Sequence, residues 1–199
     1  MIIANDIAAQ AAVRVLALLV QRTEEHSAMK ICRISTSTIL LALPLAVSAS
    51  ELKAAFVDPA WNGAIVPDGY QCQKFGGTHG SPALQVSGVP ERANALILEF
   101  SDRSYAPMDH GGHGKIGYAI EAGSTSAQVP SVPPHTTELP TGFWIVAEHG
   151  APKWDKPGAY LPPCSGGRGN AYYVTVKAVV RDGDNIEELA ETSLEMGKY

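Results

Sequence analysis

The sequence has few cysteines, little charge and no excess of positive charge. Its 199 residues include three cysteines and 18% charged residues, with 15 Lys and Arg against 20 Asp and Glu, for a formal net charge of −5. Proteins that bind nucleic acid need a basic surface to neutralise phosphates, so we do not expect a nucleic-acid partner. A hydrophobic content of 45% excludes a disordered or fibrous chain. The length predicts one domain of ordinary size.

Long apolar runs are also scarce, and the one near the start is short. Residues 29–49 contain the basic residues Lys30 and Arg33, then an apolar stretch over 37–47, then Val-Ser-Ala at 47–49. This order is typical of a cleaved secretory signal, and the stretch is too short for a permanent membrane span. We therefore predict a periplasmic or secreted protein, whose domain covers residues 50–199 and has no integral membrane segment after cleavage.

The first 28 residues precede this predicted signal. Met29 has the features of a start residue, because the basic n-region follows it at once. We interpret residues 1–28 as a misassigned N-terminal extension. The alternative is an extra anchor or a regulatory extension.

The cysteines agree with export. Cys32 belongs to the predicted signal, which leaves Cys72 and Cys164 in the mature chain. They are too far apart for a zinc knuckle, and no Cys-x-x-Cys motif accompanies them. A structural disulfide is one interpretation and two free thiols packed in the core are the other. A bridge that closes so long a loop would stabilise the fold by about 4 kcal/mol.

Beyond residue 57 glycine and proline are frequent, and strand-like apolar runs outnumber helical patterns. Strands are predicted over residues 83–86, 95–100, 115–120, 143–148 and 171–180. Residues 185–196 predict one helix, capped by Asn185 and stopped by Gly197, with an apolar stripe for docking on the sheet. The predicted fold is mainly β, a β-sandwich with long loops and a C-terminal helix.

Several short segments occur in a characteristic order along the predicted mature chain. They are Tyr-Gln-Cys at 70–72, Ser-Pro-Ala-Leu at 81–84, Ser-Gly-Val-Pro at 87–90 before the apolar run 95–100, Ser-Asp-Arg-Ser-Tyr-Ala-Pro at 101–107, Ala-Tyr-Leu-Pro-Pro-Cys at 159–164, and Asn-Ala-Tyr-Tyr-Val-Thr-Val-Lys-Ala at 170–178. In this order they resemble the bacterial branch of the phosphatidylethanolamine-binding protein (PEBP) family, also called the Raf-kinase-inhibitor-like family. The resemblance covers about residues 56–199.

The resemblance implies a β-sandwich with a small anion pocket at one end, which accepts phosphate, acetate or a phospholipid head group. It implies no metal and no organic cofactor. It also implies that the loops of Cys72 and Cys164 flank the same end of the sandwich. By this resemblance we expect the pocket to contain Asp102, His110, His113, Tyr160, Asn170 and Tyr172.

The chain departs from the family pattern at the basic residues of the pocket. The family's strand histidine falls on Gly114, next to His113, and its second histidine and arginine are replaced by Asn170 and Ala171. An asparagine amide can still donate to an anion. If the loop histidines supply the missing charge, anion binding should strengthen as pH falls through about 6.5.

Two glycine-rich loops contain further candidate binding residues. Residues 108–114, Met-Asp-His-Gly-Gly-His-Gly, suit an anion or small-ligand pocket, a structural polar loop, or a metal site through His-x-x-His and an aspartate. Residues 165–170 place Arg168 among glycines. This second loop suits either a phosphate or carboxylate cradle or a long hairpin turn.

Enzyme motifs are missing. Ser81 and Ser165 lie in no Gly-x-Ser-x-Gly elbow, and the sequence places no two carboxylates together for acid–base catalysis. We therefore expect a non-enzymatic periplasmic binding protein for a small anionic or phospholipid-head-group-like ligand. The alternative is a regulatory protein that inhibits a protein partner, such as a kinase or a protease.

Overall fold

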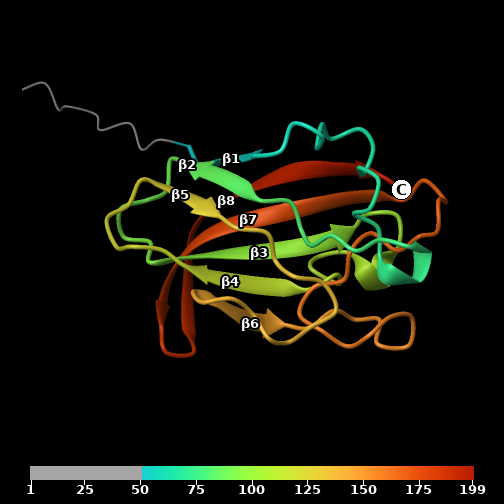
Figure 1. The fold of residues 1–199 in the computed structure, drawn as a ribbon. Coiled ribbons are helices and arrows are strands. Elements are labelled where there is room, and N and C mark those ends of the chain that lie inside the picture. Colours follow the sequence, from blue (N-terminus) through green and yellow to red (C-terminus); the bar gives the residue numbers. More distant parts are fainter. Residues whose placement is uncertain (1–50) are drawn as a thin grey trace, which may run out of the picture. The chain divides into compact units, whose positions relative to one another are not determined.

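The computed structural model describes residues 51–199, which form two antiparallel β-sheets (Figure 1). The predicted signal, residues 29–49, and the extension, residues 1–28, lie outside the described residues. Among residues 51–199, no helix is long and apolar enough to cross a membrane. The smaller sheet has the order β1-β2-β5, and the larger sheet has the order β6-β4-β3-β7-β8.

The strand bounds follow the predicted apolar runs closely. In the smaller sheet they are β1 Lys53–Phe56, β2 Leu84–Ser87 and β5 Ser126–Val129; in the larger sheet they are β3 Ala95–Asp102, β4 Lys115–Ala119, β6 Phe143–Ala147, β7 Ala171–Asp182 and β8 Asn185–Lys198. Two 3-10 helices, η1 Gln73–Phe75 and η2 Ala106–Met108, lie in the loops. The mainly β prediction is confirmed. The five predicted strands correspond to β2, β3, β4, β6 and β7, whereas β1 and β5 were not foreseen.

The core lies between the two sheets. Leu84 and Val86 of β2 and Val129 of β5 are buried in one apolar cluster with residues from β3 and β7, including Phe100 and Val176. β3 is central in its sheet, with β4 on one side and β7 on the other, and seven of its eight residues are buried. This explains why its sequence is a continuous apolar run rather than an alternating one.

The predicted C-terminal helix is wrong. Residues 185–198 form the edge strand β8, which pairs with β7 along its whole length, from Asn185 opposite Asp182 to Lys198 opposite Ala171. An isolated helix of this length is marginal in water, whereas β7 offers a long row of backbone partners. Ala190, Leu194 and Met196 contact the core with the two-residue period of a strand.

The loops at one end of the larger sheet are long, and they position the candidate site. β3 ends at Asp102 where β7 begins, because the antiparallel register places Asp102 opposite Tyr172. The chain between β3 and β4 and the chain between β6 and β7 return to this same end (Figure 1).

Candidate ligand-binding cavity

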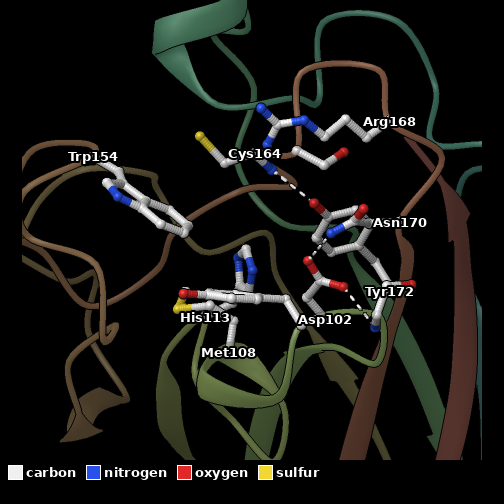
Figure 2. Close-up of a pocket in the computed structure, with 11 residues that line it drawn as sticks. Asp102, Met108, His113, Trp154, Cys164, Arg168, Asn170 and Tyr172 are labelled. Carbon is white, nitrogen blue, oxygen red and sulfur yellow. Dashed lines mark hydrogen bonds between the residues drawn. The ribbon is translucent and has the colours of Figure 1, made fainter.

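A cavity of about 360 Å³ opens at this end of the larger sheet (Figure 2). It lies between the β3–β4 loop and the residues that precede and begin β7. The residues that line it are Asp102, Ser104, Tyr105, Met108, His113, Trp154, Cys164, Ser165, Arg168, Asn170 and Tyr172. Four of the six predicted ligand-binding residues are among them: Asp102, His113, Asn170 and Tyr172.

The floor of the cavity is built on the carboxylate of Asp102, which is 4% exposed. Its Oδ1 accepts a hydrogen bond from the backbone N–H of Ser104 at 2.9 Å. Its Oδ2 accepts one from the side-chain amide of Asn170 at 2.6 Å. Asn170 is therefore oriented by Asp102, with one amide N–H already committed to that carboxylate.

Tyr172 supplies a hydroxyl group on the β7 side of the cavity. The backbone N–H of Cys164 donates to this hydroxyl oxygen at 3.1 Å. Burial raises the pKa of Tyr172 to about 12, so its hydroxyl stays protonated and keeps a hydrogen to donate. The neighbouring Ser165 hydroxyl donates instead to the main-chain oxygen of Tyr199 at 2.5 Å.

His113 enters the cavity as a neutral acceptor. Its side chain is buried, and the hydrogen bond between Nδ1 and the carbonyl oxygen of Leu161, at 2.8 Å, assigns the proton to Nδ1. Burial lowers the pKa of His113 to about 4, against the smaller opposing effects of Leu161 and Asp102. The expectation that this histidine becomes cationic near pH 6.5 is therefore wrong.

Gly114, next to His113, cannot carry a side chain. Its φ is +115°, and a Cβ at this position would lie 1.9 Å from the carbonyl oxygen of Ala159. The segments that contain Gly114 and Ala159 run so close together that no side chain fits at residue 114. His113 occupies the cavity in its place.

The other two predicted residues do not line the cavity. His110 has an exposed side chain and a φ of +50°, and its Nε2 lies 3.7 Å from Oδ2 of Asp109. Tyr160 is fully buried in the core, with its ring centroid 4.5 Å from that of Phe100. His110 was predicted from its polar glycine-rich loop and Tyr160 from its place in the family segments; the first faces solvent and the second packs in the core.

The mouth of the cavity contains residues that the sequence did not assign to the pocket. Trp154 and Tyr105 are exposed and stack on each other with centroids 5.5 Å apart. Arg168, from the second glycine-rich loop, is the lining residue that carries a fixed positive charge. No pattern in the sequence indicates the two aromatic residues, because they lie on irregular loops far apart in the chain.

A disulfide bond connects Cys72 and Cys164 beside the cavity, with Cα atoms 5.2 Å apart. This confirms the disulfide prediction. The backbone N–H of Cys72 also donates to the carbonyl oxygen of Pro163 at 2.9 Å, so the two loops are joined twice. Cys164 lines the cavity, whereas Cys72 is completely buried.

No family model matches the sequence, and no curated protein matches it. Among solved structures, the fold matches that of E. coli YbcL, which is described as a new member of the mammalian PEBP family. The similarity is one of fold alone. It has a TM-score of 0.49 at 20% identity and covers 75% of this chain and 98% of that chain.

Proposed function

We propose that the cavity binds a small anionic ligand of the phospholipid-head-group type without converting it. The supporting observation is the pairing of opposite charges across one small cavity. Arg168 provides a guanidinium that suits a phosphate, and Asp102 provides a carboxylate on the floor. A ligand that carries a phosphate and an ammonium group, such as phosphoethanolamine, complements both.

The neutral groups of the cavity fit the same ligand. The protonated Tyr172 hydroxyl can donate to a phosphate oxygen, and Nε2 of neutral His113 can accept from an ammonium group. Trp154 and Tyr105 at the mouth offer aromatic surface, which attracts ammonium groups.

Binding without catalysis is part of the proposal. Ser165 donates to the main-chain oxygen of Tyr199, and His113 donates to the Leu161 carbonyl oxygen. Neither group is paired with the other, so the serine lacks the adjacent base that would activate it as a nucleophile.

The proposed location is the periplasm or the exterior of the cell. Two observations support it: the signal-like residues 29–49 and the Cys72–Cys164 disulfide, since disulfides persist in oxidising compartments.

Isothermal titration of the purified full chain at constant ionic strength tests the proposal. The ligands are inorganic phosphate, ethanolamine and phosphoethanolamine. We expect Arg168→Gln to weaken phosphate binding by about tenfold or more, as loss of a charge-assisted hydrogen bond does. The matched control is Arg92→Gln, which removes an exposed arginine paired with Glu187 at 2.9 Å, near the opposite end of β3, and should change nothing.

The ammonium half of the ligand has its own test. Phosphoethanolamine should bind more tightly than phosphate, and Asp102→Asn should abolish that advantage. Phosphate affinity that is equal in Arg168→Gln and in the unmodified protein would overturn the proposed site. Absence of binding by all three ligands, together with stoichiometric capture of a protein partner, would favour the regulatory alternative.

A further inference from the structure

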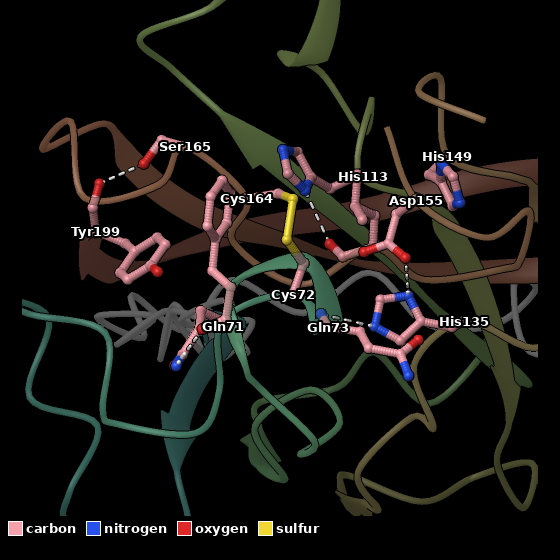
Figure 3. Close-up of a disulfide and its surroundings, with 12 residues drawn as sticks. Gln71, Cys72, Gln73, His113, His135, His149, Asp155, Cys164, Ser165 and Tyr199 are labelled. Atoms are coloured by element: carbon pink, nitrogen blue, oxygen red, sulfur yellow. Dashed lines mark hydrogen bonds and ion pairs between the residues drawn. A yellow bond between two sulfur atoms is a disulfide. The ribbon is translucent and has the colours of Figure 1, made fainter. Parts of the chain in front are cut away.

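The side chains of Cys72, Cys164 and Asp155, which come from separate loops, lie close together at the disulfide (Figure 3). The sulfur atoms of Cys72 and Cys164 and a carboxylate oxygen of Asp155 all lie within 4.8 Å of one another. Two sulfurs and a carboxylate are ligand types that Zn²⁺ prefers. In the oxidised protein the sulfurs are bonded to each other and do not ligate as thiolates.

The carboxylate of Asp155 has an orphaned oxygen. The side chain is 6% exposed, and Oδ1 accepts a hydrogen bond from the backbone N–H of Lys156 at 2.8 Å. Oδ2 is buried and has no hydrogen-bond partner among the described residues. A buried carboxylate oxygen without a donor is costly and rare, so this atom calls for a partner that the oxidised protein does not supply.

His135 lies beside this carboxylate. The backbone N–H of Gln73 donates to Nε2 of His135 at 3.3 Å, which places the ring proton on Nδ1. Nδ1 lies 3.3 Å from Oδ1 of Asp155 without forming a hydrogen bond among the described residues, and the His135 side chain is 9% exposed. Metal-binding carboxylates and imidazoles are commonly held by such a second group, which fixes their direction.

The loop that carries Asp155 is also anchored on its other side. Nε2 of the buried His149 donates to the carbonyl oxygen of Lys156 at 2.8 Å, and its Nδ1 accepts from the backbone N–H of Ala151 at 3.2 Å. These bonds close the loop around Trp154 and Asp155. The carboxylate is therefore held beside the sulfurs by contacts that do not depend on the disulfide itself.

We propose that reduction of the Cys72–Cys164 disulfide creates a binding site for Zn²⁺ or a similar divalent ion. The ligands are the two thiolates and the Asp155 carboxylate, with His135 as a positioning residue and the fourth position open. In a tetrahedral zinc site, ligand atoms lie about 3.5 to 3.8 Å apart, which follows from Zn–S and Zn–O bonds of about 2.3 and 2.1 Å. The three groups already lie within 4.8 Å of one another, and the two sulfurs, which are bonded in the oxidised protein, move apart to this separation once the bond is reduced.

The chemical step balances with a dithiol as the reductant. The dithiol gives two electrons and two protons to the disulfide and becomes a disulfide itself, which leaves Cys72 and Cys164 as thiols. The metal ion then displaces one proton from each thiol. Attack comes at Cys164, because this sulfur borders the cavity while Cys72 is completely buried.

Cobalt(II) binding tests the site, since a cobalt–thiolate complex has a charge-transfer absorption and tetrahedral cobalt has strong visible bands. The protein is the untagged full chain with Cys32→Ser, so that Cys72 and Cys164 are its remaining cysteines. We expect one equivalent of Co²⁺ in the dithiol-reduced, desalted protein, displaced by Zn²⁺, and no such absorption in the oxidised protein. Absence of the absorption in the reduced protein, or its presence in both forms, would overturn the proposal.

The variant Asp155→Asn tests whether the site uses the Asp155 carboxylate as a ligand or consists of the two thiolates alone. It should weaken Co²⁺ binding at least tenfold and change the visible bands, while it leaves the disulfide of the oxidised protein intact. The matched control is His110→Ala, which removes an exposed histidine from the glycine-rich loop 108–114. It should change neither the Co²⁺ affinity nor the visible bands. Unchanged cobalt affinity and spectrum in Asp155→Asn would contradict the proposal.

If the reduced protein unfolds, one equivalent of Zn²⁺ should restore its far-UV circular dichroism, and failure to do so would also contradict the proposal.

Discussion

Asn170 donates its side-chain amide to the buried carboxylate of Asp102 across 2.6 Å. This bond links the end of β3 to the residue that precedes β7, at the position where the family pattern has a histidine. A neutral amide therefore satisfies the carboxylate without adding a charge that titrates.

Replacement of Asn170 by alanine should lower the free energy of unfolding by about 1 to 3 kcal/mol, because it removes a donor from a buried carboxylate. Urea unfolding followed by circular dichroism measures this. Asn62→Ala is the control, since Asn62 is exposed and its side chain accepts from the backbone N–H of Ala64 two residues away. Equal effects of the two substitutions would show that the Asp102–Asn170 bond does not stabilise the fold.

His113 should make the protein lose stability as pH falls below neutrality. Its pKa is about 4 in the folded protein and about 6.5 when unfolded, so between these values the unfolded chain binds the extra proton. The contribution of His113 to the free energy of unfolding is fully present above pH 6.5. It declines by about 3 kcal/mol as pH falls to 4. Unfolding free energies between pH 4 and 7.5 should show this slope, and His113→Gln should flatten it. A slope that the substitution leaves unchanged would assign the pH dependence to other groups.

Sulfate affinity should not change between about pH 5.5 and 8. Sulfate keeps its charge over this range, and burial holds the pKa of His113 at about 4, below this range. Titration calorimetry of the full chain at several pH values measures this. If the affinity instead rises as pH falls, and His110→Ala abolishes this rise, then the exposed His110 takes part in binding.

Loss of the disulfide should lower the free energy of unfolding by about 4 kcal/mol, because the bond closes a loop of 92 residues. The double variant Cys72→Ser and Cys164→Ser tests this in urea, with Cys32→Ser as the control. Thiol titration of the denatured full chain should find one reactive thiol, that of Cys32. Three reactive thiols would show that the bond does not form.

Five of the eight strands could be predicted from the sequence, because their signals are local. The apolar run of β3 and the aromatic and β-branched residues of β7 have strand-like length and composition. The disulfide was one of two interpretations, and two cysteines in the predicted mature chain allow one pairing. The helix predicted over residues 185–196 failed because a glutamate-rich edge strand has the composition of a helix. Its strand conformation is imposed by the backbone of β7, which lies outside the window that periodicity examines.

The sequence by itself indicated a β-rich domain with polar residues in its long loops. Asp102, His113, Asn170 and Tyr172 were expected at the cavity through the resemblance of short segments to a known family. Tertiary structure alone decided which loop residues meet. In the structure, His110 and Tyr160 do not line the cavity, whereas Trp154 and Arg168 do. Asp155 lies beside the disulfide. Tertiary structure also made His113 neutral, since the charge of a histidine depends on its burial. Burial and loop paths arise from contacts between residues far apart in the chain, and no local pattern records them.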